Sequence, residues 1–217
     1  MTSEPAQEPG NLGTPERLRQ RRSPQQRRGR AAFDRILRAT GELLDEVGYD
    51  GVTTLNIAER AGVNIATLYR YFPNKLAVLR ALAERLDGAR AEAVAVALAG
   101  MSTGGDWRAT IHFAVAETAR LRAAQPGGRA LRRALQSSPE LWQVDHDQTV
   151  RVAGGLAARL CELRPALDAG VAHDVALVVV TTVTALLDLG NAPEIDQDRI
   201  LAQMQAMLEG YLARYLD

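Results

Sequence analysis

Apolar side chains recur at intervals of three and four residues along most of the chain, the spacing that places them on one face of an α-helix. The first such segment carries Phe33, Ile36, Leu37, Leu44 and Val47 and stops at Gly48. Later segments cover about residues 54–61, 64–72, 75–98, 106–124, 129–136, 138–163, 171–189 and 196–216. Almost no segment alternates apolar and polar residues as a half-buried strand does. The pattern predicts an all-α protein of about nine helices.

One run has the β-branched composition of a strand, from Val178 to Thr184. It lies inside the continuous apolar pattern of residues 171–189, which contains no turn signal, so we predict a buried helix there. Charged residues are absent only from Val175 to Leu187, a stretch of thirteen residues that is short for a bilayer span. The N-terminus has no apolar leader region. The sequence therefore predicts a cytoplasmic protein without a membrane segment.

Residues 53–72 form the most informative segment of the chain. Thr54 is the expected N-cap of a short helix that places Ile57, Ala58 and Ala61 on one face. Gly62 then supplies the left-handed conformation that ends a helix. The pattern predicts a tight turn at this point.

A second short helix follows the turn, with Asn64 as its expected N-cap. Leu68 and Phe72 point one way at i, i+4, while Thr67, Arg70 and Tyr71 are expected to face outward. Two short helices joined by a tight turn are typical of a helix-turn-helix, whose second helix enters the major groove of DNA.

The helix-turn-helix pattern and its flanks together resemble the tetracycline-repressor (TetR) family of bacterial transcription regulators. The resemblance spans about residues 31–80 and rests on Gly48 to Thr54, Ile57-Ala58, Ala61-Gly62-Val63, Thr67 to Phe72, Lys75 and Leu79. It implies a helix-turn-helix domain over residues 31–77 and a helical effector-binding and dimerisation domain over residues 78–217. Residues 1–30, rich in Pro, Gln, Gly and Arg and without apolar periodicity, are expected to precede both domains as a disordered basic arm.

The resemblance also implies which side chains meet double-stranded DNA. Thr54, Tyr71 and Lys75 correspond to contacts with the DNA backbone. The positions from which base-reading residues are drawn hold Asn64, Ile65, Ala66, Thr67 and Arg70. Thr53 and Tyr69 complete the candidate set, and Tyr69 equally suits a place in the three-helix core. Leu55 stands where some family members carry a polar base reader, which predicts sparse direct readout.

Charge is distributed unevenly along a chain whose formal net charge is zero. Residues 1–30 hold seven arginines against three glutamates, and the basic residues nearest the first helix are Arg27, Arg28 and Arg30. A net positive charge confined to one end of the chain argues against a protein that coats DNA by bulk electrostatics. The segment is either a solvated tail or an arm that reaches phosphates or a minor groove, and we favour the arm.

The chain lacks the motifs of common catalytic, metal and cofactor sites. It has no phosphate-binding glycine loop, no dinucleotide-binding glycine pattern and no metalloprotease or hydrolase signature. The three histidines His112, His146 and His173 have no metal-ligand spacing, and Cys161 is the single cysteine. We therefore expect no enzymatic activity, no metal and no cofactor.

The C-terminal helices contain polar residues among apolar ones, which suits a small-molecule cavity with a few hydrogen-bonding groups. The alternative is a core whose polar groups are bonded internally. The candidate ligand-binding residues are Phe113, Glu117, Trp142, His146, Thr149, Leu156, Val180, Thr181 and Thr184. They predict a largely apolar effector.

The last two helices are expected to form a homodimer, because their apolar surface exceeds the needs of one core and a two-fold axis suits a palindromic operator. The expected interface residues are Val175, Val179, Val183, Leu186, Met204, Leu208 and Leu212. The sequence thus predicts a dimeric, DNA-binding transcriptional regulator, a repressor released by a small apolar effector. One alternative is a regulator with no small-molecule effector. Another is an α-helical enzyme or carrier that merely contains a helix-turn-helix.

Overall fold

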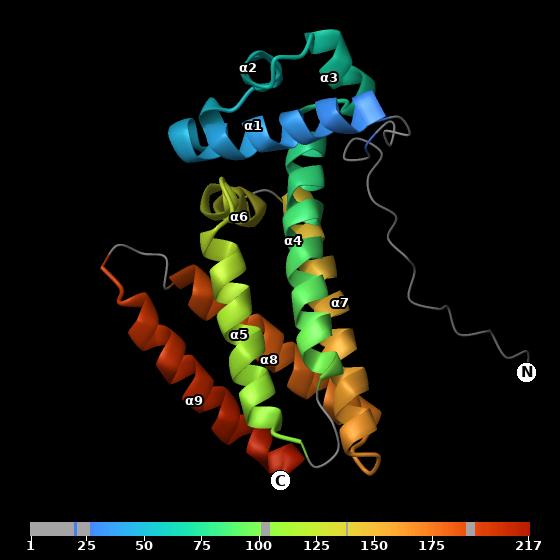
Figure 1. Ribbon diagram of the computed structural model, residues 1–217, viewed down its shortest axis with the longest axis vertical. Helices are drawn as coiled ribbons and strands as arrows, with labels where there is room; N and C mark the ends of the chain where they lie inside the picture. Colours follow the sequence, from blue (N-terminus) through green and yellow to red (C-terminus); the bar gives the residue numbers. More distant parts are fainter. Residues whose placement is uncertain (1–19, 21–26, 101–104, 138, 190–193) are drawn as a thin grey trace, which may run out of the picture.

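The computed structural model describes residue 20 and residues 27–100, 105–137, 139–189 and 194–217 of the chain. Every regular element in these residues is an α-helix, which confirms the predicted fold class. The helices are α1 (Arg27–Gly51), α2 (Thr54–Arg60), α3 (Ile65–Tyr71), α4 (Lys75–Ala99), α5 (Trp107–Ala123), α6 (Gly128–Ser137), α7 (Pro139–Leu163), α8 (Ala169–Leu189) and α9 (Gln197–Leu216). Helices α1, α2 and α3 lie at one end of α4, α5 and α7 run beside its length, and α9 lies beyond α5 (Figure 1).

The N-cap of α2 is Thr53, not Thr54 as the sequence predicted. The Thr53 hydroxyl accepts a hydrogen bond from the backbone N–H of Asn56 at 3.2 Å. The Asn56 side chain accepts one in return from the backbone N–H of Thr53 at 2.9 Å. This reciprocal pair, a capping box, satisfies two N–H groups at the start of the helix. Thr53 and Thr54 are equally suitable caps by residue type. The reciprocal bonds with Asn56 make Thr53 the N-cap.

The turn between α2 and α3 has the predicted geometry. Gly62 has a φ of 62°, in the left-handed region that favours glycine. Val63 N–H donates to the Ala58 carbonyl at 3.0 Å, and Gly62 N–H donates to the Glu59 carbonyl at 3.1 Å. Asn64 then caps α3, its side chain accepting from the backbone N–H of Ala66 at 2.8 Å. These bonds fix the direction in which α3 leaves α2.

Helix α1 begins at Arg27, about one turn before the predicted domain boundary at residue 31. Residues 27–30 contain no apolar side chain, so the periodicity gives no sign of this turn, although arginine is a good helix former. The last four residues of the predicted disordered arm are therefore helical. The rest of that arm, residues 1–19 and 21–26, lies outside the described residues.

The buried side chains form two clusters. The first is centred on Ile36, Leu37, Leu68 and Phe72 and joins α1, α2, α3 and the start of α4 to Leu131 and its neighbours on α6. The second joins the end of α4 to α5, α7, α8 and α9. Helix α4 contributes to both clusters, so it links the two ends of the molecule directly.

Helix α6 provides a second link, because the turn that precedes it lies against α1. The Gly127 N–H donates to the Asp45 carboxylate at 2.6 Å. A Cβ atom added to Gly41 would lie 2.7 Å from the Pro126 carbonyl oxygen, too close for any side chain. The absence of side chains at Gly41 and Gly127 allows this backbone contact.

Helix α8 contains the β-branched run, which is helical as predicted. Its 21 residues include a window of mean hydropathy 1.8. By length and composition the helix could therefore cross a membrane, although its charge-free stretch of thirteen residues predicted otherwise. Only 28% of that window is buried within the subunit. The buried side includes Val175 and Val179, whereas Val171 and Val178 are exposed. A helix apolar on two sides fits a core on one side and a further packing surface on the other.

Candidate DNA-binding surface and ligand cavity

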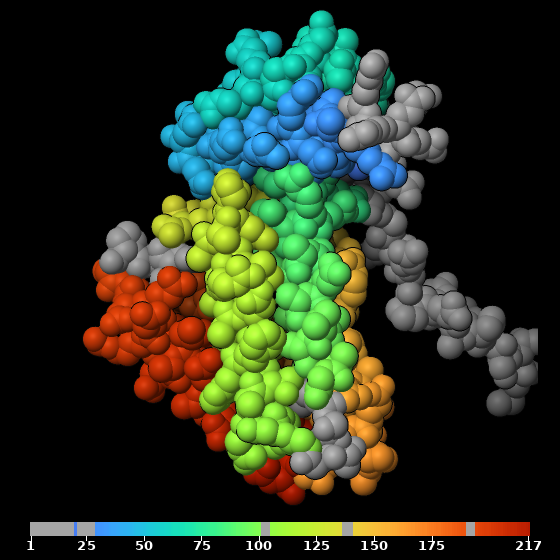
Figure 2. Space-filling model, viewed as in Figure 1, coloured from blue at the N-terminus to red at the C-terminus, as the bar shows by residue number. Residues whose placement is uncertain are grey.

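Helix α3 buries one side and exposes the other at the end of the molecule (Figure 2). Leu68 and Phe72 have no exposed surface, as predicted. Asn64, Ala66, Tyr69 and Arg70 are exposed. The exposed side starts at a capped helix N-terminus and is free of carboxylates. This arrangement allows the helix to approach a DNA groove closely.

Two of the side chains predicted to face outward do not fully do so. Thr67 is half-buried, and Tyr71 is buried with 4% of its surface exposed. The Tyr71 ring packs edge-on against Phe33, with ring centroids 6.0 Å apart. Tyr71 lies three residues after Leu68, on the same side of the helix, so the spacing itself indicated the core. Its hydroxyl accepts a hydrogen bond from Arg70 at 3.1 Å, and the Arg70 guanidinium lies 5.0 Å from the ring centroid.

Tyr69 is 39% exposed, which decides against its predicted alternative in the core. Its hydroxyl lies 3.0 Å from the Thr54 hydroxyl, at hydrogen-bond distance. This contact ties the first residue of α2 to the exposed side of α3. Beside it, Thr53 and Leu55 are exposed, Leu55 at 58%.

Lys75 begins α4 and is held by Tyr49. Its ammonium donates to the Tyr49 carbonyl at 3.0 Å and lies 4.1 Å from the centroid of the Tyr49 ring. The side chain is half-buried. Ile65 is half-buried as well and packs against the first core cluster. Of the candidate base readers, Asn64, Ala66 and Arg70 thus remain the most accessible.

The start of α1 lies beside the exposed helix α3. Phe33, on the second turn of α1, contacts the rings of Tyr71 and Phe72, so this end of α1 lies beside the C-terminal end of α3. Arg30 is exposed there, and Arg27 and Arg28 precede it on the same helix. Arg60, in contrast, forms a two-pronged pair with Glu46 at 2.6 and 2.7 Å. Exposed positive charge, that of Arg30, therefore lies beside α3 at the start of α1.

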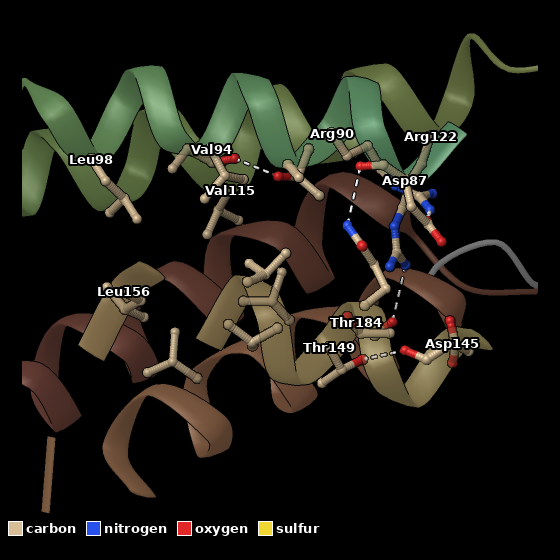
Figure 3. A pocket seen from close by; sticks show the side chains of 18 of the residues that line it. Asp87, Arg90, Val94, Leu98, Val115, Arg122, Asp145, Thr149, Leu156 and Thr184 are labelled. Atoms are coloured by element: carbon tan, nitrogen blue, oxygen red, sulfur yellow. Dashed lines mark hydrogen bonds and ion pairs between the residues drawn. The ribbon is translucent and has the colours of Figure 1, made fainter. Parts of the chain in front are cut away.

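A cavity of about 110 Å³ lies between α4, α5, α7 and α8 (Figure 3). That volume is several times the roughly 10–15 Å³ that one water molecule needs. Four of the predicted ligand-binding residues line it: Thr149, Leu156, Val180 and Thr184. The cavity is polarised, with Leu98 and Leu156 at one end and Asp87, Arg90 and Arg122 at the other.

The other five predicted ligand-binding residues do not line the cavity. Phe113 and Trp142 are 59% and 51% exposed. The Trp142 ring stacks on His146, which is also exposed, with centroids 4.8 Å apart. Glu117 pairs with Arg120 on the surface, and Thr181 is exposed. Trp142 and His146 lie on the first turns of α7, where this side of the helix is exposed, whereas Leu156 further along is buried.

Five charged residues line the cavity that the sequence analysis missed: Asp87, Arg90, Arg122, Arg132 and Asp145. Arg132 donates to Asp145 at 3.0 Å, and Arg90 pairs with Asp87. A usable signal was present, because Asp87 and Arg90 continue the helical stripe of Val94 and Leu98 on α4. Charged residues that extend an apolar stripe indicate a buried polar site rather than a solvated face.

Asp188, on α8, joins this cluster of charges. Its Oδ1 accepts from Arg122 Nη1 at 2.9 Å and from Arg132 Nε at 3.1 Å. Arg122 Nη1 also donates to the Thr184 carbonyl at 3.1 Å. Burial raises the pKa of the Asp188 carboxyl despite both arginines. Desolvation therefore outweighs the attraction within these ion pairs.

Burial also disfavours the charged form of two of the arginines. Burial, and after it the nearby charges of Arg132 and Arg122, lowers the pKa of Arg90 to about 9. Burial, followed by the charge of Arg132, lowers the pKa of Arg122 to about 10. Both groups stay cationic at neutral pH. Three guanidinium groups are thus held close together at one end of an apolar cavity.

The residues predicted for the dimer interface lie in the core of the subunit instead. Val175, Val179, Met204, Leu208 and Leu212 are each exposed by 5% or less. Val183 and Leu186 are half-buried against the second core cluster. Apolar periodicity identifies the more apolar face of a helix, which here serves the subunit's own core. Exposed apolar residues on other faces of α8 and α9 are Val171, Val178, Leu189 and Met207.

The described residues thus define a class of protein: a helix-turn-helix with an exposed second helix, joined by α4 to a helical region with a cavity. Sequence comparisons agree with this class. A sequence model described as "Bacterial regulatory proteins, tetR family" matches residues 36–82. Another, described as "Tetracyclin repressor-like, C-terminal domain", matches residues 106–212.

Individual transcriptional repressors also match part of the chain. Over 51 residues the chain is 53% identical to the Tetracycline repressor protein class A from transposon 1721 of Escherichia coli. The match covers 24% of each of the two chains. Over 57 residues it is 51% identical to the HTH-type transcriptional repressor KstR of Rhodococcus jostii, 24% of this chain and 27% of that one. These matches span only about a quarter of the curated relatives.

The solved structure of a TetR-family transcriptional regulator from Streptomyces coelicolor matches over far more of the chain. It covers 85% of this chain and 99% of that one, with 33% sequence identity and a TM-score of 0.65. The chain belongs to the TetR family. The protein is a DNA-binding transcriptional regulator.

Proposed function

We propose that the protein is a homodimeric repressor that binds a palindromic operator through α3 and is released from it by a small molecule. The observation that carries the proposal is the direct connection between the two candidate sites. Phe72 ends α3 in the first core, and after a short break α4 begins at Lys75 and lines the cavity with Asp87, Arg90 and Leu98. Repressors among the relatives support the direction of regulation.

DNA binding rests on α3 and on the charge beside it. Asn64, Ala66 and Arg70 offer an amide, a methyl group and a guanidinium on the exposed side of the helix. Arginine can pair with guanine through two hydrogen bonds in the major groove. Arg27, Arg28 and Arg30 at the start of α1 would contact phosphates, and the residues before them would extend the contact as an arm.

A homodimer would cover the exposed apolar positions of α8 and α9. Val171, Val178 and Leu189 on α8 and Met207 on α9 stand at the solvent-facing side of these helices. Val171, Val178 and Leu189 are separated by seven and eleven residues, close to two and three turns of helix, so the α8 positions form one stripe. Pairing of two such stripes about a two-fold axis would bury them and place two α3 helices on successive half-sites.

The effector response requires a ligand that binds the non-DNA-binding arrangement more tightly than the DNA-bound one. A hundredfold loss of operator affinity needs a coupling of about 2.7 kcal/mol. A ligand in the cavity would act on α4 directly and on α6 through Arg132, and α6 meets α1 at Gly127 and Asp45. Both routes lead to the orientation of α3.

The cavity favours this function over a regulator without an effector, whose C-terminal core would be filled. The rival of an α-helical enzyme or carrier has no comparable support, and loss of all function on deletion of residues 1–75 would count against it.

Selection of bound duplexes from a random DNA pool tests the proposal. We expect enrichment of a site with two inverted halves whose centres lie about 34–36 Å apart, one turn of duplex. Enrichment of no common sequence would contradict the assignment of α3 as a reading helix. Enrichment of a single half-site would contradict the homodimer.

A further inference from the structure

The charged end of the cavity carries information about the ligand, because it is built differently from the rest of the lining. Val94, Leu98 and Leu156 supply an apolar wall. Past them, three arginines but only two aspartates line the cavity, and the third aspartate, Asp188, lines the neighbouring cleft. A site that binds a purely apolar molecule gains nothing from buried charges, since their desolvation costs stability.

One of these arginines has an unused donor. Arg122 Nε is buried, and none of the described residues accepts its hydrogen. The same guanidinium uses Nη1 for both the Thr184 carbonyl and Asp188. Buried donors without an acceptor are rare in proteins, and an unsatisfied charged group is costly. An anionic group bound here would supply the missing acceptor.

The three arginines also stand between two spaces. Arg90, Arg122 and Arg132 line both the apolar cavity and a larger cleft that opens beside α1 and α6. Arg129 and Arg133 of α6 line the same cleft. A ligand head at the arginines is therefore reachable from the cleft, while its apolar part would lie along the apolar wall of the cavity. From Ala91 to Leu98 the apolar wall of α4 extends for roughly 10 Å, at 1.5 Å per helical residue.

We propose that the effector is an amphiphilic anion whose apolar arm lies along Val94, Leu98 and Leu156 and whose carboxylate or phosphate head binds Arg90 and Arg122. This inference rests on the proposed function, because it names the chemical class of the ligand for that cavity. Guanidinium groups suit both heads, since each can accept two parallel hydrogen bonds from one arginine. The head would join α4 to α5 and, at Arg132, to α6.

Calorimetric titration of the full-length protein with four matched ligands tests the inference. Decanoate, decan-1-ol and decylamine share one chain and differ in head charge, and decyl phosphate separates a phosphate head from a carboxylate. We expect decanoate or decyl phosphate to bind at least about tenfold more tightly than decan-1-ol, equivalent to about 1.4 kcal/mol, and decylamine to bind most weakly. Equal affinities for the acid and the alcohol, or no binding of either anion, would overturn the inference.

Arg122→Gln gives a second test in a variant designed to fold. Asp188 keeps its bond from Arg132, and glutamine retains a polar, uncharged end at this position. The matched control is Arg120→Gln, two residues away, where the arginine is exposed and pairs with Glu117. We expect the preference for anion over alcohol to fall about tenfold in Arg122→Gln only. An unchanged preference in that variant would overturn the assignment of the head to Arg122.

Operator binding, measured separately in the same samples, reports on the proposed function. Anion-selective binding without operator release would leave the ligand class standing and contradict the effector role. Operator binding by a protein that shows no anion preference would contradict the ligand class and leave the proposed DNA-binding function standing. The two proposals therefore fail by different measurements.

Discussion

The hydroxyl groups of Thr54 and Tyr69 lie 3.0 Å apart and link the first residue of α2 to the exposed side of α3. The bond is exposed, and it fixes the Tyr69 ring across the start of α2. We expect Thr54→Val and Tyr69→Phe each to lower the free energy of unfolding by about 0.5–1.5 kcal/mol. In a double-mutant cycle measured by urea unfolding, the double variant should lose less than the sum of the single variants. Strict additivity would show that the two hydroxyls act independently.

Removal of residues 2–26 should leave the folded core intact, because α1 begins at Arg27 and both hydrophobic clusters lie beyond it. The deletion removes Arg17, Arg19, Arg21 and Arg22. Each lost phosphate contact should make the plot of log affinity against log salt shallower by about 0.9. Replacement of the same four arginines by glutamine is the matched variant at full length. An unchanged salt slope in both would identify the segment as a passive tail.

Glutamate at Val178 together with Met207 should give folded monomers, because both side chains are exposed and apolar, at 49% and 46%. Phe113→Glu is the control, since Phe113 is equally exposed but lies on α5. Sedimentation or light scattering reports the mass, and circular dichroism reports the fold. A dimer that survives the double substitution would place the interface elsewhere.

The same test at the positions predicted from sequence should have a different result. Leu208 and Leu212 are 2% and 0% exposed, so glutamate there buries unpaired charge in the subunit core. We expect loss of the folded state instead of clean dissociation. The contrast between the two pairs of substitutions separates core from interface.

His146→Phe should leave the effector response unchanged, because His146 is exposed and stacks on Trp142 outside the cavity. Val180→Phe, in contrast, adds volume to the cavity wall. It should weaken effector binding while operator binding by the ligand-free protein stays within a few fold, at a stability cost of about 1–3 kcal/mol. Operator-release titrations compare the two variants. A response lost in His146→Phe and kept in Val180→Phe would place the ligand on the outer face of α7.

Periodicity and turn chemistry predicted the helices well, because each helix of this chain buries a continuous stripe. Gly62 and Asn64 fix the turn of the helix-turn-helix by local bonds, and both were readable from residue type. The start of α1 was not, since residues 27–30 contain no apolar side chain. Local signals are sufficient where one helix and its caps decide the outcome.

The sites were less predictable, because they depend on which neighbour covers a face. Val175 and Leu208 are apolar whether they face a core or a partner, and only the packing of α7, α8 and α9 assigns them to the core. Arg122 and Arg132, on the consecutive helices α5 and α6, both pair with Asp188 on α8, far away in the sequence. No spacing along the chain encodes that meeting.

The central claim is that the exposed side of α3 reads operator DNA, and substitution of Arg70 tests it most directly. The measurement is the affinity of wild type, Arg70→Ala and Lys75→Gln for the selected operator and for operators changed at single base pairs. Arg70→Ala should cost about 1–3 kcal/mol and relax preference at one position in each half-site. Lys75→Gln should weaken all sequences alike and reduce the salt slope by about one unit. If Arg70→Ala binds the operator and its variants with the affinity and selectivity of wild type, the account of α3 as the reading helix is wrong.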